Sequence, residues 1–254
     1  MYSGNFLVEA EVSETGRLRI NVGIHPMGFA WHLGPGQEFC TPQVLVVRSN
    51  KGLGGLSRMQ HRIILDKILP KSWADTSPPI LLNSWEARYF QVNHTNVVEM
   101  VKHAVQIGVN LLVLDDGWFG SRDDIMSSLG DWTPNKVKFP HGLKALADEI
   151  NSHGVKFGLW VEPEMVSEQS ALYSEHPDWC LSVPGRAKQL GRHQLVLDLS
   201  RSLVVNYLFG VLECLFSAAN IEYVKWSLLK LSHFPALTSL IYSSLYNVGI
   251  SIDL

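Results

Sequence analysis

The sequence predicts an α/β fold built on a parallel β-sheet and preceded by antiparallel strands. Three observations lead to this prediction. Between Pro78 and Trp226, short apolar segments alternate with amphipathic segments of helical length, as in right-handed βαβ units. Before about residue 70, apolar and polar residues alternate as in half-exposed strands. The 254 residues, 46% hydrophobic and 18% charged, suffice for a large core, and the length suits one (β/α)8 barrel.

Composition also excludes several classes of function. The formal net charge of −3 argues against binding to nucleic acid or to a membrane surface, so neither is expected as a partner. The three cysteines, Cys40, Cys180 and Cys214, lie far apart and form no C-x-x-C pair. We therefore expect free thiols, no metal site and no cofactor.

The first region, residues 1–75, is expected to hold short strands. Phe6–Val12 and Leu18–Val22 alternate in polarity on either side of a turn at Gly16. A turn at 34–36 precedes the apolar run Val44–Val47. No helix is expected before about residue 54.

The second region, residues 76–226, carries the alternating pattern. Its predicted strands are Ile80–Leu82, Leu111–Leu114, Phe157–Val161, Leu195–Leu197 and Tyr223–Trp226. Helices are expected between them, with one short helix after Ser167. Their apolar faces are Val97, Val98, Val101, Ala104 and Val105; then Leu143, Leu146, Ala147 and Ile150; then Leu203, Val204, Tyr207, Leu208, Val211, Leu212 and Leu215. The expected helix N-caps are Asn96, with Glu99 three residues on, and Ser200. Gly108 and Gly154 are expected to end helices.

The third region, residues 227–254, has a different composition. It is rich in Leu and Ser, and its charged residues are Lys230 and Asp253. It has no clear helical period, so no fold is predicted for it.

Chemically active side chains gather where the predicted parallel strands end. Ligands of parallel α/β folds bind at these carboxyl ends. The residues there are Asn83, Trp85, Glu86, Asp115, Asp116, Trp160, Glu162, Glu164 and Lys225. Carboxylates accept hydrogen bonds from sugar hydroxyls, and tryptophan offers a flat apolar face, so this set suits a sugar. Taken singly, each has another explanation: a capping aspartate, a packed tryptophan, a solvated glutamate or, for Arg192, a surface arginine.

Several longer motifs point to one family. They are Asn83–Ala87, Val113–Gly120, Ser128–Trp132, Phe157–Val166, His176–Trp179 and Gln194–Arg201. Together they resemble the retaining α-galactosidases of glycoside hydrolase family 36, the melibiase-like enzymes, over about residues 1–226. The resemblance implies three parts: residues 1–75 as the end of an antiparallel β-sandwich domain, 76–226 as the first half of a (β/α)8 barrel, and 227–254 as a non-homologous tail of a truncated chain.

The resemblance also implies a galactose pocket. Its substrate-binding residues would be Asp115 and Asp116 for the sugar hydroxyls, Trp85 and Trp160 for the aromatic walls, and Arg192 and Lys225 for hydroxyls and the catalytic carboxylate. In the family the last of these strands reads Lys-Trp-Asp, and the aspartate is the nucleophile. Here it reads Lys225-Trp226-Ser227. A serine without an activating base cannot take that role. No later segment matches the motif of the acid/base carboxylate, so no catalytic residue is expected to be intact.

Three functional hypotheses follow. The first is an α-galactosidase, which releases terminal α-galactose from raffinose-type oligosaccharides with retention, represented here by a chain without turnover. The second is a non-catalytic galactoside-binding protein. The third is another enzyme that uses Glu162 or Glu164. The first residues carry no signal peptide pattern, so the cytoplasm is the default location, although a full-length parent could be secreted or form a homo-oligomer.

Overall fold

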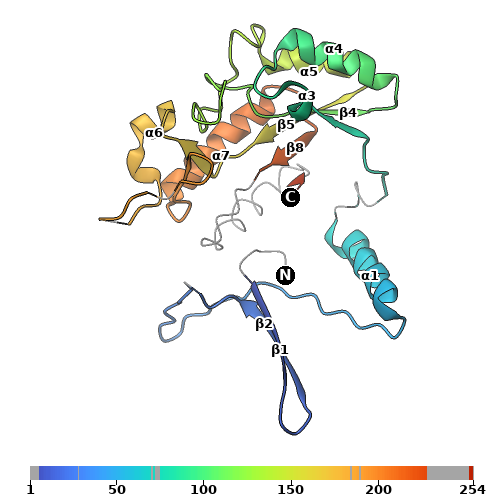
Figure 1. Cartoon of the computed structure of the whole chain (residues 1–254), viewed down its shortest axis with the longest axis vertical. Helices are drawn as coiled ribbons and strands as arrows, with labels where there is room; N and C mark the ends of the chain where they lie inside the picture. The colour runs from blue at the N-terminus through green and yellow to red at the C-terminus, as the bar shows by residue number, and fades with distance from the viewer. Residues whose placement is uncertain are drawn as a thin grey trace. The chain divides into compact units, whose positions relative to one another are not determined.

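The computed structural model describes residues 6–27, 29–69, 71, 75–183, 185–188, 190–227 and 252–253. These residues fall into two compact units, one ending at Pro78 and the other beginning at Pro79 (Figure 1). Every residue that the sequence places at the sugar site belongs to the second unit.

In the described residues of the first unit, a hairpin is followed by a helical segment. Strands β1 (Phe6–Val12) and β2 (Leu18–Ile24) pair antiparallel. Helix α1 (Gly52–Ile63) continues into a π-helical turn, η1 (Ile64–Ile68). The hairpin confirms the alternating pattern, whereas the strand predicted at Val44–Val47 is wrong, because these residues are not in a strand.

The β-sandwich predicted for residues 1–75 is not confirmed. The described residues of this unit form a single two-stranded sheet. Its apolar side chains remain exposed, among them Phe6, Val8, Val12, Leu18 and Ile20. A second sheet packed on this hairpin would bury such side chains, and the described part of the unit does not supply one.

The second unit is organised around a parallel sheet. Its strand order is β3-β4-β5-β8-β9, and every pairing in it is parallel. The strands are β3 (Leu81–Asn83), β4 (Leu111–Leu114), β5 (Lys156–Val161), β8 (Tyr223–Trp226) and β9 (Ile252–Asp253). Each strand in this order follows the previous one in the chain, so the sheet grows at one edge.

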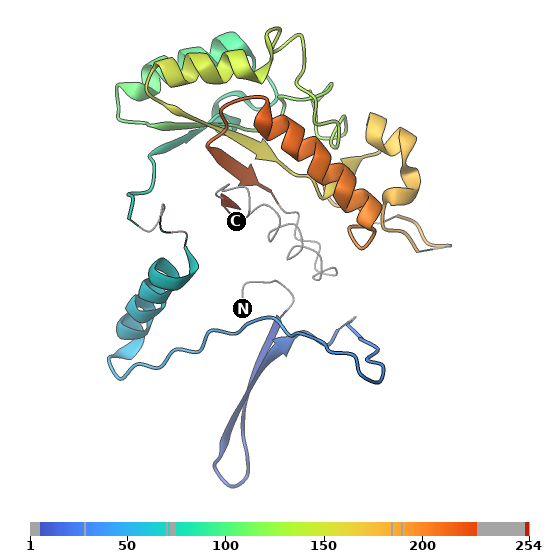
Figure 2. The ribbon, with the colours of Figure 1, turned by 180° about the vertical axis from the view of Figure 1, so that it is seen from behind.

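Three helices cover the sheet: α4 (His94–Val105), α5 (Gly142–Ser152) and α7 (Ser202–Ser217). Figures 1 and 2 show α4 and α5 side by side along it. All three contribute to one core with Leu112 and Leu114 of β4. The alternate residues Leu111 and Val113 form a separate cluster with Tyr223. Because successive strand residues face opposite sides, the three helices share one face of the sheet.

The predicted strands and helices of this unit are confirmed, but two end signals are wrong. Helix α4 starts after Asn93, whose side chain accepts from the backbone N–H of Asn96 while Asn96 bonds back to Asn93. Asn96 is thus the third helical residue and not the N-cap. Ser200 does not cap α7, because its hydroxyl bonds to Asp198 Oδ1 at 2.6 Å and Arg201 occupies the cap position.

An excursion separates β5 from β8. It contains β6 (Met165–Ser167), α6 (Ala171–Glu175), the 3₁₀ turn η2 (Pro177–Trp179) and β7 (Gln194–Val196). Strand β7 corresponds to the strand predicted at Leu195–Leu197, but it pairs antiparallel with β6 and stays out of the main sheet. A further short helix, α3 (Trp85–Arg88), follows β3. Most of the tail, residues 228–251 and 254, lies outside the described residues.

Candidate functional site

Asp115 lies at the centre of a hydrogen-bond network at the carboxyl end of the sheet. Its Oδ2 accepts from Lys225 Nζ at 2.5 Å and from Asn83 Nδ2 at 2.7 Å. Its Oδ1 accepts from the backbone N–H of Asp116, and its own N–H donates to Ser84 Oγ at 2.9 Å. Strands β3, β4 and β8 therefore each contribute to holding this buried carboxylate.

The turn after Asp116 requires glycine and is held by the partly buried ammonium group of Lys138. Gly117 has φ +102°, and a Cβ there would lie 2.9 Å from Phe90 Cα. Lys138 Nζ donates to three backbone carbonyls, those of Phe90, Gly117 and Arg122, at 2.8–3.1 Å. It also pairs with the carboxylate of Asp123. The loop that follows β4 is thus fixed from both sides.

Asp116 is paired with a fully buried arginine. Arg122 Nε lies 3.0 Å from Asp116 Oδ1, and Nη2 lies 2.9 Å from Oδ2. Burial raises the pKa of Asp116, and the hydrogen bonds and charge of Arg122 oppose that rise. The arrangement holds a second carboxylate directly beside Asp115.

Two glutamates follow β5, of which Glu162 is buried and Glu164 is half-buried. The carboxylate of Glu162 faces the side chain of Gln194. Burial raises the pKa of Glu162 to about 7, although the nearby charge of Arg192 and a hydrogen bond from Gln194 oppose the rise. Burial raises the pKa of Glu164 to about 7 as well, against a hydrogen bond from Trp226. Either group can exchange a proton near neutral pH.

Trp85 and Trp160 differ in their surroundings. Trp85 is half-buried, and its ring meets those of Tyr89 and Phe90 edge to face. Trp160 is only 4% exposed and packs with Phe119 and Trp132 in the core. The structure gives Trp160 a packing role, so its contact with a sugar stays a prediction.

Arg192 lies in a tight turn before β7. Gly191 and Gln194 exchange backbone hydrogen bonds, and the two residues between them, Arg192 and His193, have φ of 53° and 63°. Both are left-handed backbone conformations, which residues other than glycine rarely adopt. Arg192 is exposed, and its electrostatic contact is with Glu162. The structure brings Asp115, Asp116 and Lys225 together at one edge, whereas contacts of Arg192 with that set are not seen in the described residues.

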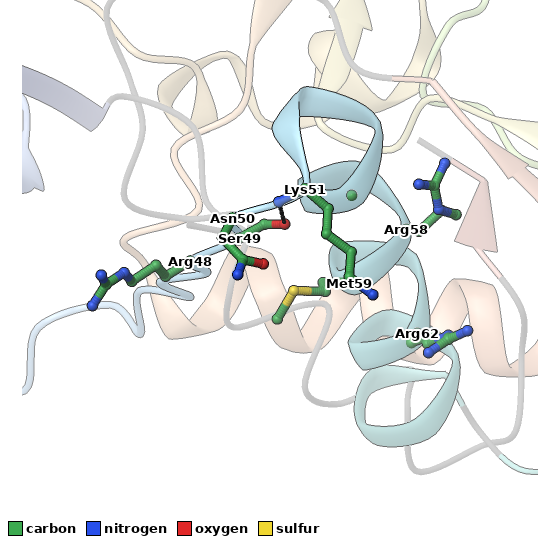
Figure 3. Close-up of a pocket in the computed structure, with 8 residues that line it drawn as sticks. Arg48, Ser49, Asn50, Lys51, Arg58, Met59 and Arg62 are labelled. Atoms are coloured by element: carbon green, nitrogen blue, oxygen red, sulfur yellow. Dashed lines mark hydrogen bonds between the residues drawn. The ribbon is translucent and has the colours of Figure 1, made fainter.

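A separate pocket of about 530 Å³ lies in the first unit, at the start of α1. It is lined by Arg48, Ser49, Asn50, Lys51, Gly55, Arg58, Met59 and Arg62. Figure 3 shows the Arg48 side chain pointing to one side and those of Arg58 and Arg62 to the other. These cations do not converge on a common point, so we assign no ligand to this pocket.

The site chemistry is that of a polyol site. It offers two neighbouring carboxylates, an ammonium group and an amide within one hydrogen-bonded cluster. Within the described ranges, no group of three or more His, Cys, Asp or Glu side chains is placed to hold a metal ion. In the same part of the chain, no helix is long and apolar enough to cross a membrane.

Comparison with known protein families identifies the family of this chain. Residues 38–239 match the Melibiase family. The chain belongs to the melibiase family. Curated relatives of this melibiase chain include α-galactosidase AgaA of Geobacillus stearothermophilus, 48% identical over 90% of the chain and 31% of the relative. Mel36A of Lactobacillus acidophilus is 44% identical over 89% of the chain and 31% of the relative.

Solved structures agree with the assignment to the melibiases. The crystal structure of AgaA, a family 36 α-galactosidase, superposes with a TM-score of 0.85 over 89% of this chain and 31% of its own. An α-galactosidase from Lactobacillus brevis, 35% identical, gives a TM-score of 0.88 over 99% of this chain and 37% of its own. Variants of AgaA have been solved with raffinose and with stachyose. The melibiase chain spans about a third of the length of the curated relatives it matches.

Ser227 follows β8 in the melibiase chain and continues its ladder. Its backbone N–H donates to the carbonyl of Val161 at 2.9 Å. Residue 227 therefore stands at the carboxyl end of β8, beside the end of β5 and two residues after Lys225. The family resemblance predicts the nucleophile at this position, where this chain has a serine.

Sequence reasoning missed two residues that organise this candidate site, Arg122 and Lys138. A buried carboxylate needs a cation or several donors, so a partner for Asp116 could have been sought in the loop after it. Arg122 lies six residues downstream. Lys138 gave no such signal, because its partners are backbone carbonyls that the sequence does not distinguish.

Proposed function

We propose that this protein binds the terminal α-D-galactosyl unit of galacto-oligosaccharides at Asp115, Asp116 and Lys225. We also propose that the full-length family member hydrolyses this unit with retention. The single observation that carries the proposal is the side-by-side placement of the two aspartates, each held by a cation. Such carboxylates make strong, charge-assisted hydrogen bonds to hydroxyl groups. The relatives solved with raffinose and stachyose support the choice of sugar. Trp85, Trp160 and Arg192 are proposed as further contacts.

We further propose that the sheet of the second unit is the first half of a (β/α)8 barrel. Two features support this architecture. The strands of the sheet are added in chain order at one edge, and α4, α5 and α7, the long helices among the described residues of the unit, lie on one face. A doubly wound sheet would instead carry helices on both faces. The hairpin of β1 and β2 is proposed as the end of a β-sandwich domain. The family match extends to residue 239, so the tail expected at 227–254 is proposed only for residues 240–254.

This chain is proposed not to hydrolyse the sugar. A retaining glycosidase needs two carboxyl groups about 5–5.5 Å apart, one of them as nucleophile. Ser227 stands at the nucleophile position, and no base is described beside it to activate the hydroxyl. Purified chain incubated with nitrophenyl α-galactoside should release nitrophenol no faster than a protein-free blank. Release above the blank would refute this part of the proposal.

The position of the nucleophile can be tested by Ser227→Asp. Dinitrophenyl α-galactoside has a leaving group that departs without protonation, so no acid is needed for the first step. The new carboxylate should attack the anomeric carbon, release dinitrophenolate and retain one galactosyl group per chain. Mass spectrometry should detect that adduct. Ser227→Asn, which has the same shape without a nucleophile, is the matched control. Absence of the adduct in a folded Ser227→Asp chain that binds galactose would place the nucleophile elsewhere.

The hydroxyl at residue 227 also favours a second candidate function, a non-catalytic galactoside-binding protein. Both candidate functions require the chain to bind galactosides. Calorimetry with methyl α-galactoside tests this, and saturable binding by a monodisperse chain is expected. Asp115→Ala should abolish this binding. Turnover by a chain that keeps its activity after Asp115→Ala would support the third hypothesis, catalysis by Glu162 or Glu164.

A further inference from the structure

Arg122 is a completely enclosed charged side chain near the site. It has no solvent exposure. Its guanidinium lies over the rings of Phe90 and Phe119, at 5.5 and 6.0 Å from their centroids. Its Nη1 donates to the carbonyl of Ser127 at 2.8 Å, and its Nε and Nη2 donate to Asp116. All three nitrogens of the guanidinium are therefore held by hydrogen bonds.

Such a buried ion pair is a poor way to gain stability. Replacing a buried pair by apolar residues is often neutral or stabilising, because the desolvation of two charges offsets their attraction. We propose that Arg122 is the positioning residue that keeps the Asp116 carboxylate ionised and turned toward the bound sugar, an inference that rests on the proposed galactoside site.

The geometry of the pair supports orientation. Arg122 Nε lies 3.0 and 3.3 Å from the two oxygens of Asp116, and Nη2 lies 2.9 Å from Oδ2. A guanidinium bound to both oxygens fixes the plane of the carboxylate. A carboxylate can accept about four hydrogen bonds, and Nε and Nη2 of Arg122 together with the N–H of Gly117 occupy part of this capacity, so room for a sugar hydroxyl remains on Asp116.

The charges around Asp116 support ionisation. Burial, which comes first, and the neighbouring charge of Asp115 raise the pKa of Asp116. The hydrogen bonds and charge of Arg122, together with the N–H of Gly117, lower it. From β5, Glu162 faces the same carboxylate, and from β8, Lys225 neutralises Asp115. Arg122 is thus the cation in direct contact with Asp116.

The loop around Arg122 is itself fixed by an exposed aspartate. Asp124 Oδ1 accepts from the backbone N–H groups of Met126 and Ser127 at 2.7 and 2.9 Å. This turn presents the Ser127 carbonyl to Arg122. Because Asp124 is exposed, its replacement tests the positioning of Arg122 without a change in the core.

The experiment measures the affinity for methyl α-galactoside from pH 5 to pH 8. Arg122→Lys keeps the charge but cannot bind both oxygens, so the affinity at pH 7 should fall about tenfold. The pH at which affinity is lost on acidification should also rise, by about one unit, because the pKa of Asp116 is held down less. Arg201→Lys is the matched control, since Arg201 pairs with Asp178 at the surface. It should change neither value.

Asp124→Ala keeps the test decisive if Arg122→Lys does not fold. It should weaken binding about threefold and move the pH midpoint in the same direction. Unchanged affinity and midpoint in the folded variants would overturn the role of Arg122 and leave the galactoside site standing. Absence of binding by the unaltered chain would overturn the proposed function, and this inference with it.

Discussion

Raising the pH from 5 to 8 is expected to destabilise the second unit through Glu162. Burial raises the pKa of this side chain from 4.5 to about 7. The unfolded chain releases the proton near 4.5, whereas the folded chain holds it until about 7. Between these values the unfolded state binds fewer protons, so the free energy of unfolding falls as pH rises. Above pH 7 it no longer changes through this group.

The size of the effect follows from the two pKa values. A difference of one pKa unit corresponds to about 1.4 kcal/mol, so the step from 4.5 to about 7 amounts to about 3 kcal/mol. Glu164 acts in the same direction, because its pKa is also raised to about 7 by burial. A loss of this size is a large part of the stability of a domain.

The assay is urea unfolding followed by tryptophan fluorescence at pH 5 and pH 8. Glu162→Gln removes the titrating group and keeps the shape, so it should match the unaltered chain at pH 5 and exceed its stability by up to about 3 kcal/mol at pH 8. Glu213→Gln, on the exposed side of α7, is the control and should change neither value. Equal pH dependence in Glu162→Gln and the unaltered chain would show that Glu162 titrates normally and that the reasoning is wrong.

Three further predictions concern the loops and the sheet. Gly117→Ala should cost at least about 2 kcal/mol in urea unfolding, because φ is +102° and the new Cβ would meet Phe90; an unchanged midpoint would contradict the turn geometry. Lys225→Met should lower galactoside affinity at least about tenfold in calorimetry, since Asp115 loses its cation, while Lys156→Met at the opposite end of β5 should leave affinity intact. Asn93→Ala should destabilise α4 by about 1 kcal/mol, measured as a thermal shift, and Asn93→Ser should recover most of it; equal losses in both would argue against the cap.

Strands and helices with strong local signals could be predicted from the sequence. Strand β4 is a run of four apolar residues, and all four are buried. The four apolar residues predicted for α5 are the four that the helix buries. These elements could be predicted because a helix or strand that buries one or both faces must carry apolar residues at a fixed spacing.

Features that depend on distant partners were harder to predict. Asn93 and Asn96 both suit a cap, and only the reciprocal hydrogen bonds decide between them. Strand β7 is apolar like the core strands, yet its partner is β6, which the pattern did not mark. For the site, the sequence indicated Asp115, Asp116 and Lys225, whereas the buried pairing of Arg122 required coordinates.

The one-edge growth of the parallel sheet has a consequence for folding during synthesis. Each of β4, β5 and β8 pairs with a strand that precedes it in the chain, so a docking edge already exists when the next strand leaves the ribosome. The contact between Lys225 and Asp115 joins residues 110 positions apart. The carboxylate cluster is thus completed only when β8 docks. Until then, when nearly all the described part of this unit has been made, Asp115 lacks the ion pair with Lys225.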